Sequence, residues 1–157
     1  MMSKETRLKE ILAKQAQAAA KRRDQAEQDD LKEKDAADLQ AKVLAAWPGK
    51  RERIQAYIAK LNQKMAPNGV QLYIRSDRTE ERNAIDTMTI AFEQFPSGGA
   101  TNFKRLTIVP IASGRVKVTM GTSSQWPTKH YDLQVLDALD SSFEDAVLDF
   151  LDANPDG

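Results

Sequence analysis

Apolar and polar residues alternate in four short segments of the middle of the chain, residues 70–75, 87–93, 104–109 and 115–120. Successive side chains of a β-strand point to opposite faces, so each segment would have one apolar and one polar side. A weaker alternation at 129–135, through Tyr131, Leu133 and Val135, suggests a fifth strand. The pattern predicts an antiparallel meander of four to five strands with one face on the core and one in water.

The connecting segments contain residues that favour turns. Asn68-Gly69 precedes the first predicted strand, Ser97-Gly98-Gly99 separates the second from the third, and residues 110–114 begin with proline and end with glycine. The connecting segment at residues 76–83 is longer than these turns and highly charged, which indicates an exposed hairpin loop.

Two amphipathic helices are predicted on either side of the sheet segments. Within 49–65, an apolar stripe is spaced at i, i+3, i+4, i+7 and i+11 and consists of Ile54, Tyr57, Ile58, Leu61 and Met65. Near the C-terminus, Ser141 and Glu144 have the spacing of a capping box, and the helix should end near Ala153. Its apolar face consists of Phe143, Val147, Phe150 and Leu151. We expect both helices to cover the apolar face of the sheet, which gives an α+β fold.

A long helical arm is predicted before this domain. Ser3 can cap it, and no glycine or proline follows before Pro48, which is expected to end this helix and start the next. The predicted organisation is an arm at 1–47, an α+β domain at 48–153 and a loose tail at 154–157.

The arm has an interrupted apolar pattern. Leu8, Ile11 and Leu12 form one cluster, and the apolar residues that follow, as far as Leu31, are all alanine. A sustained coiled coil would place large apolar residues throughout the arm. Two interpretations remain open: a solvated, partly frayed helix, or a helix whose Leu8, Ile11 and Leu12 bind a protein partner or a second copy of the chain.

Charge distribution, cysteine content and the N-terminal residues indicate the cellular compartment of the protein. The formal net charge is zero, but residues 49–66 carry a net charge of +4 and residues 132–157 a net charge of −8. The absence of cysteine excludes disulfides and thiolate metal sites and is typical of a reducing compartment. The N-terminus is polar and is followed by no sustained apolar run, so neither a signal peptide nor a membrane span is predicted. We expect a cytoplasmic protein.

No catalytic, cofactor or metal site is predicted. His130 is the only histidine, and its neighbours Ser123, Ser124 and Asp132 do not by themselves indicate a catalytic triad. The last helix carries aspartates at helical spacing rather than at the alternate positions of a calcium loop, which predicts a solvated acidic face. That face, Asp145, Asp149 and Asp152, could meet the basic line Arg53, Lys60 and Lys64.

The polar face of the predicted sheet carries four basic side chains and one aromatic, Tyr73, Arg75, Arg105, Arg115 and Lys117. Such a surface suits single-stranded nucleic acid, although an ordinary exposed sheet face also carries threonine and long basic side chains. The leading hypothesis is a small non-enzymatic interaction or adaptor module, monomeric or dimeric, that uses the arm or the open sheet face. The alternative is a nucleic-acid-binding module that uses the basic face.

Overall fold

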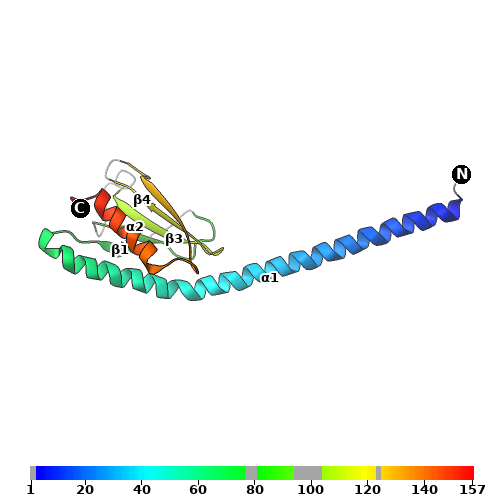
Figure 1. Ribbon diagram of the computed structural model, residues 1–157, viewed down its shortest axis with the longest axis horizontal. Helices are drawn as coiled ribbons and strands as arrows, with labels where there is room; N and C mark the ends of the chain where they lie inside the picture. The colour runs from blue at the N-terminus through cyan, green and yellow to red at the C-terminus, as the bar shows by residue number, and fades with distance from the viewer. Residues whose placement is uncertain (1–2, 77–80, 94–103, 123–124) are drawn as a thin grey trace. The chain divides into compact units, whose positions relative to one another are not determined.

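The computed structural model describes residues 3–76, 81–93, 104–122 and 125–157. The chain divides into two compact units, Met1–Asp38 and Leu39–Gly157. The elements in chain order are α1 (Lys4–Met65), the short 3-10 helix η1 (Ala66–Asn68), β1 (Tyr73–Arg75), β2 (Met88–Ala91), β3 (Arg105–Pro110), β4 (Arg115–Met120), β5 (Lys129–Gln134) and α2 (Asp140–Ala153) (Figure 1). The α+β fold with a long N-terminal helix is therefore confirmed.

The strands form one antiparallel sheet in the order β1-β2-β3-β4-β5, so the meander and its fifth strand are confirmed. The first strand is shorter than predicted and begins at Tyr73 rather than at residue 70. Asn62 of α1 explains this difference: its side-chain oxygen accepts the Leu72 N–H at 2.8 Å, and its side-chain nitrogen donates to the Leu72 carbonyl at 2.9 Å. The backbone of Leu72 therefore bonds to a helix side chain. The predicted turn at 97–99 lies outside the described residues.

Burial alternates along β4, where Val116, Val118 and Met120 are buried and the residues between them are more exposed. Strand β2 does not follow this alternation. Thr89, and Thr87 just before this strand, fall on the polar side of the alternation in segment 87–93, but both are buried, Thr89 with only 1% of its surface exposed. Thr89 pairs in register with Arg75 on one side and Thr107 on the other, so the long Arg75 side chain can shield it.

The predicted break at Pro48 is wrong, because α1 continues through this residue to Met65. A proline inside a helix removes one hydrogen bond and costs roughly 3 kcal/mol. The buried residues on both sides, Val43, Trp47, Ile54 and Ile58, lie within about 60° of one another around the helix at 100° per residue. One continuous helix therefore keeps all four in the core, while Pro48 is on the exposed side.

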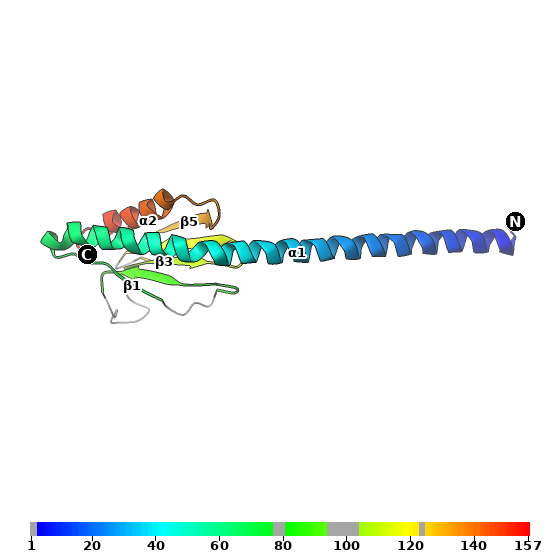
Figure 2. The ribbon, with the colours of Figure 1, turned by 90° about the horizontal axis from the view of Figure 1, so that it is seen from below.

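The buried side chains of the Leu39–Gly157 unit form one cluster. It joins residues of α1, all five strands or their flanks, and α2, with Phe143 and Phe150 among the largest fully buried side chains. In Figures 1 and 2, α2 and the part of α1 that follows Leu39 lie side by side along the sheet. Trp47 contacts Phe143 edge to face, with ring centroids 6.3 Å apart.

A half-buried carboxylate links α1 to the start of β2. Asp86 accepts hydrogen bonds from Trp47 Nε1 at 2.8 Å and from the Arg51 guanidinium, and its other oxygen accepts the Thr87 N–H at 2.8 Å. Burial alone would raise the pKa of Asp86, but these hydrogen bonds and the charge of Arg51 outweigh it and lower the pKa. Asp86 is thus held ionised between two elements far apart in sequence.

Helix α2 begins at Asp140 and not at a capping box. Its N-cap residue is Leu139, which has no side-chain cap, and Ser141 lies inside the helix. Contacts from α1 hold the chain at this point instead: Lys50 Nζ donates to the Ala138 carbonyl at 2.7 Å, and Arg53 bonds to Asp140. The end of the helix at Ala153 is as predicted.

Candidate functional site

The helical arm, taken by itself, is almost entirely exposed. Its first turn is capped as predicted, since Ser3 Oγ accepts the Thr6 N–H at 3.2 Å. Every described residue from Ser3 to Asp38 is exposed except Ala19, which is half-buried. The large apolar side chains Leu8, Ile11 and Leu12 are 55%, 44% and 53% exposed. Their spacing places them on one side of the helix, and we call this cluster the arm surface.

The basic residues predicted to bind nucleic acid share the polar side of the sheet but lie at different ends of it. Tyr73 and Arg105 both pair with Ala91 and so lie in one row across the strands. Arg115 and Lys117 lie in the N-terminal half of β4, away from this row. Arg75 lies between the two groups, in a row with Thr89 and Thr107. The five residues therefore form two groups with Arg75 between them.

At the β4 end, the charges are compensated by carboxylates. Arg115 donates two hydrogen bonds to Asp132, at 2.7 and 3.0 Å, and Lys117 forms an ion pair with Glu81 at 2.9 Å. The Arg115 guanidinium lowers the pKa of the Asp132 carboxyl. A shallow depression of about 310 Å³ is lined here by both basic residues, His130 and Asp132. This end attracts phosphate less than its arginine and lysine alone would suggest.

At the other end, the structure adds an aromatic side chain that sequence reasoning missed. The Arg105 guanidinium lies over the Trp126 ring, 4.3 Å from its centroid, in a cation–π contact. Trp126 belongs to the connection between β4 and β5, which carries no periodic pattern, so no sequence signal placed it on the sheet. Tyr73, Arg105 and Trp126 are the residues here that could stack on a base or bind a phosphate.

His130 is exposed, and its Nδ1 lies 3.4 Å from the hydroxyl of Thr119. Its sequence neighbour Asp132 bonds to Arg115, and Ser123 and Ser124 lie outside the described residues. The described residues around His130 therefore assemble no nucleophile and base. Within the part of the chain that the structure describes, no group of three or more histidine or carboxylate side chains could hold a metal ion.

The acidic face of α2 is only partly solvated. Asp145 and Asp152 are exposed, but Asp149 accepts hydrogen bonds from Lys129 at 2.8 Å and from the Tyr131 hydroxyl. Both hydrogen bonds lower the pKa of Asp149, and the bond from Lys129 has the larger effect. The expected acidic face is therefore wrong at Asp149, which bonds to β5 because the side chains of Lys129 and Tyr131 point to the helix.

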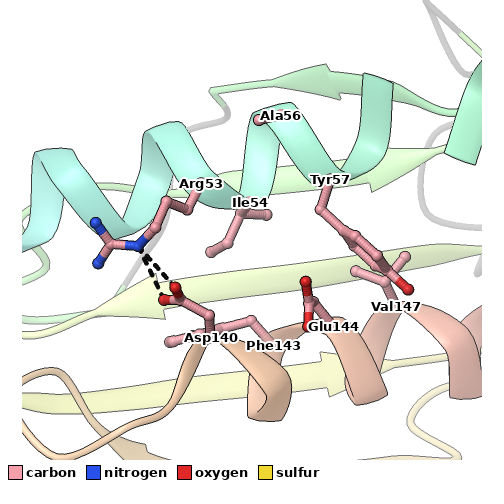
Figure 3. A pocket seen from close by; sticks show the side chains of 8 residues that line it. All are labelled: Arg53, Ile54, Ala56, Tyr57, Asp140, Phe143, Glu144 and Val147. Atoms are coloured by element: carbon pink, nitrogen blue, oxygen red, sulfur yellow. Dashed lines mark hydrogen bonds and ion pairs between the residues drawn. The ribbon is translucent and has the colours of Figure 1, made fainter. Parts of the chain in front are cut away.

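A small cavity lies between α1 and α2 (Figure 3). Arg53 and Asp140 bridge it at one side, with 2.9 Å between Nε and a carboxylate oxygen. Ile54, Phe143 and Val147 supply apolar lining. Its volume of about 220 Å³ is below the roughly 300–1,000 Å³ typical of small-molecule sites. We therefore interpret this cavity as a packing feature between two helices.

Comparison with protein-family models found no match for this chain, and no curated protein or solved structure matched it significantly. Across the described residues, no helix combines the length and apolar character needed to cross a membrane.

Proposed function

We propose that this protein is a small, non-enzymatic, cytoplasmic interaction module that binds a protein partner through the arm surface, Leu8, Ile11 and Leu12. The single observation that carries this proposal is the exposure of all three side chains on one side of the arm helix. Burying contiguous exposed apolar side chains against a partner lowers the free energy. A helix that presents anchors at i, i+3 and i+4 suits a groove or another helix.

The arm and the Leu39–Gly157 unit have different roles in the proposed function. In this proposal, α2 and the part of α1 after Leu39 cover the apolar side of the sheet. The shared core of both helices and the sheet supports this assignment. The exposed arm then carries the interaction, because the Leu39–Gly157 unit has its own core.

A photo-crosslinking experiment tests the arm surface. We expect a benzophenone amino acid in place of Ile11 to crosslink the full chain to a specific protein in the cells that make it. The matched control carries the same group in place of Gln17, which lies on the opposite side of the arm helix at 100° per residue. Equal labelling from both positions, or labelling from neither, would contradict the proposal.

A second candidate function, binding of single-stranded nucleic acid, is favoured by one specific observation, the contact of Trp126 with Arg105. Together with Tyr73, this contact offers two aromatic side chains and a cation on the polar side of the sheet. Base stacking on an aromatic side chain contributes about 1–3 kcal/mol per base. The carboxylate partners of Arg115 and Lys117 make this candidate weaker than the arm surface.

For this candidate we expect Trp126→Ala to weaken binding of a single-stranded oligonucleotide by about tenfold, since it removes one stacking partner. Arg115→Gln is the matched control, and its effect should be smaller because Asp132 already compensates Arg115. The measurement is a fluorescence titration at two salt concentrations, and phosphate neutralisation predicts weaker binding at the higher one. Salt-independent binding, or no binding by the wild-type chain, would exclude this candidate.

A further inference from the structure

The charges of the helical arm are divided into two opposite halves. Residues 3–23 hold seven basic and two acidic side chains, and residues 24–38 hold two basic and seven acidic ones. The net charges are therefore +5 and −5, and the sign changes between Arg23 and Asp24. Both halves belong to α1, and their side chains are exposed apart from the half-buried Ala19. The arm is thus a charged rod with a basic end and an acidic end.

The arm also has one side with more apolar residues than the others. At 100° per residue, this side follows the direction of Leu8 to within about 60°. Its apolar members are Leu8, Ile11, Leu12, Ala19, Ala26 and Ala37. They extend the arm surface into both charged halves, so a partner helix laid along this side would meet both.

We propose that the partner of the arm surface is the arm of a second copy of this chain, in antiparallel orientation. This inference rests on the proposed function and names its partner. A two-fold symmetric interface must be complementary to itself, and a segment with net charges of +5 and −5 in its two halves meets that requirement. An antiparallel pair turned about Arg23–Asp24 places residues 9–23 of each arm, with a net charge of +4, on residues 24–38 of the other, with a net charge of −5. A parallel pair would place like charges together.

Ion pairs between the charged halves and burial of apolar side chains would both stabilise this dimer, and the ion pairs make it sensitive to salt. A surface ion pair contributes less than about 1 kcal/mol, so the attraction depends on the number of pairs. The charge halves then determine orientation, and the apolar side chains add the area that is buried. Since the Debye length falls from about 10 Å at 0.1 M salt to about 3 Å at 1 M, we expect the dimer dissociation constant to rise at least about tenfold between these conditions.

Disulfide trapping tests the orientation, and the chain has no cysteine of its own to interfere. In a pair turned about Arg23–Asp24, residue 15 faces residue 32, one position from residue 33, and residues 15 and 33 lie on the same side of the helix. We expect the mixture of Gln15→Cys and Glu33→Cys chains to form a mixed disulfide, whereas Gln15→Cys alone does not. In the matched control, Gln17→Cys with Glu33→Cys, the first thiol points away from the partner and no disulfide forms. A disulfide from Gln15→Cys alone would show a parallel pair and overturn the proposal.

Charge reversal tests the electrostatic basis. One chain carries Lys21→Glu, Arg22→Glu and Arg23→Glu, and the other carries Asp24→Lys and Glu27→Lys. At the centre of an antiparallel pair, each chain alone would place like charges together, so sedimentation equilibrium at low salt should show weaker dimerisation than for the wild-type chain. The mixture restores opposite charges at both contacts and should form a heterodimer. This rescue also shows that both variants still fold.

Two further results would overturn this inference. One is a wild-type chain that is monomeric at about 100 µM in low salt, where weak protein pairs still associate. The other is charge-reversed chains that each dimerise as well as wild type. Neither result would contradict the proposed function, provided that the crosslinker at Ile11 still labels a different protein. If the crosslinker labels no protein while the purified chain is monomeric, both proposals fail.

Discussion

Replacing Trp47 with alanine is expected to lower the free energy of unfolding by about 4 kcal/mol, as for other buried aromatic residues. The Trp47 ring is buried, it contacts Phe143 edge to face, and its Nε1 donates to Asp86. The substitution leaves a cavity between α1 and α2 and removes one hydrogen bond from a half-buried carboxylate. Urea denaturation followed by circular dichroism measures this change.

Two further variants separate the contributions of Trp47. Trp47→Phe keeps an aromatic ring in the core but removes the donor, and we expect a loss of about 2 kcal/mol. Leu44→Ala lies on the same helix at an exposed position and should cost less than about 1 kcal/mol. If Trp47→Ala cost no more than Leu44→Ala, the placement of Trp47 in the core would be wrong.

The second large effect is expected at Asp86 and depends on pH. The folded state lowers the pKa of Asp86 below its ordinary value, so the unfolded chain binds this proton more readily. The stability contributed by Asp86 is therefore fully present well above pH 4 and is lost as the pH falls through the lowered pKa. At neutral pH, Asp86→Ala should cost about 3 kcal/mol, because Trp47 loses its acceptor and Arg51 its half-buried partner.

The measurement compares urea denaturation at pH 7 and at pH 3 for wild type and Asp86→Asn. We expect a smaller loss of stability on acidification in the variant, because an amide does not titrate. Asp137→Asn is the matched control at an exposed aspartate, and it should follow the wild-type pH dependence. Parallel pH profiles for wild type and Asp86→Asn would show that Asp86 is not linked to folding.

The sheet was largely predictable because its signal is local. The alternation of Val116, Val118 and Met120 is visible in the sequence, and β4 has the predicted bounds. The predicted break at Pro48 is wrong because tertiary packing on both sides of the proline outweighs its local cost. The correct signal was present: Val43 and Trp47 are in helical phase with Ile54 and Ile58.

The contacts that sequence reasoning missed are long-range. Asp86 lies 39 residues from Trp47, and Trp126 lies 21 residues from Arg105 in the sequence. At Ser141, by contrast, a local pattern was visible but did not form. Lys50 and Arg53 of α1 bond to Ala138 and Asp140, and the helix begins at Asp140 without a capping box. Of the candidate surfaces, the exposed cluster at Leu8, Ile11 and Leu12 was visible in the sequence, whereas the ion pairs of Arg115 and Lys117 were not.

The order of the strands has a consequence for how the chain reaches its native state. Every strand that the structure describes pairs only with its neighbours in the sequence. The connections between paired strands contain 4 to 13 residues, so each closes at a modest loss of chain entropy. The longer closures are those that bring Trp47 to Asp86 and Lys50 to Ala138. Chains dominated by local pairing fold faster than those that must first join distant segments. We therefore expect the hairpins to form early and the docking of α1 to complete the core.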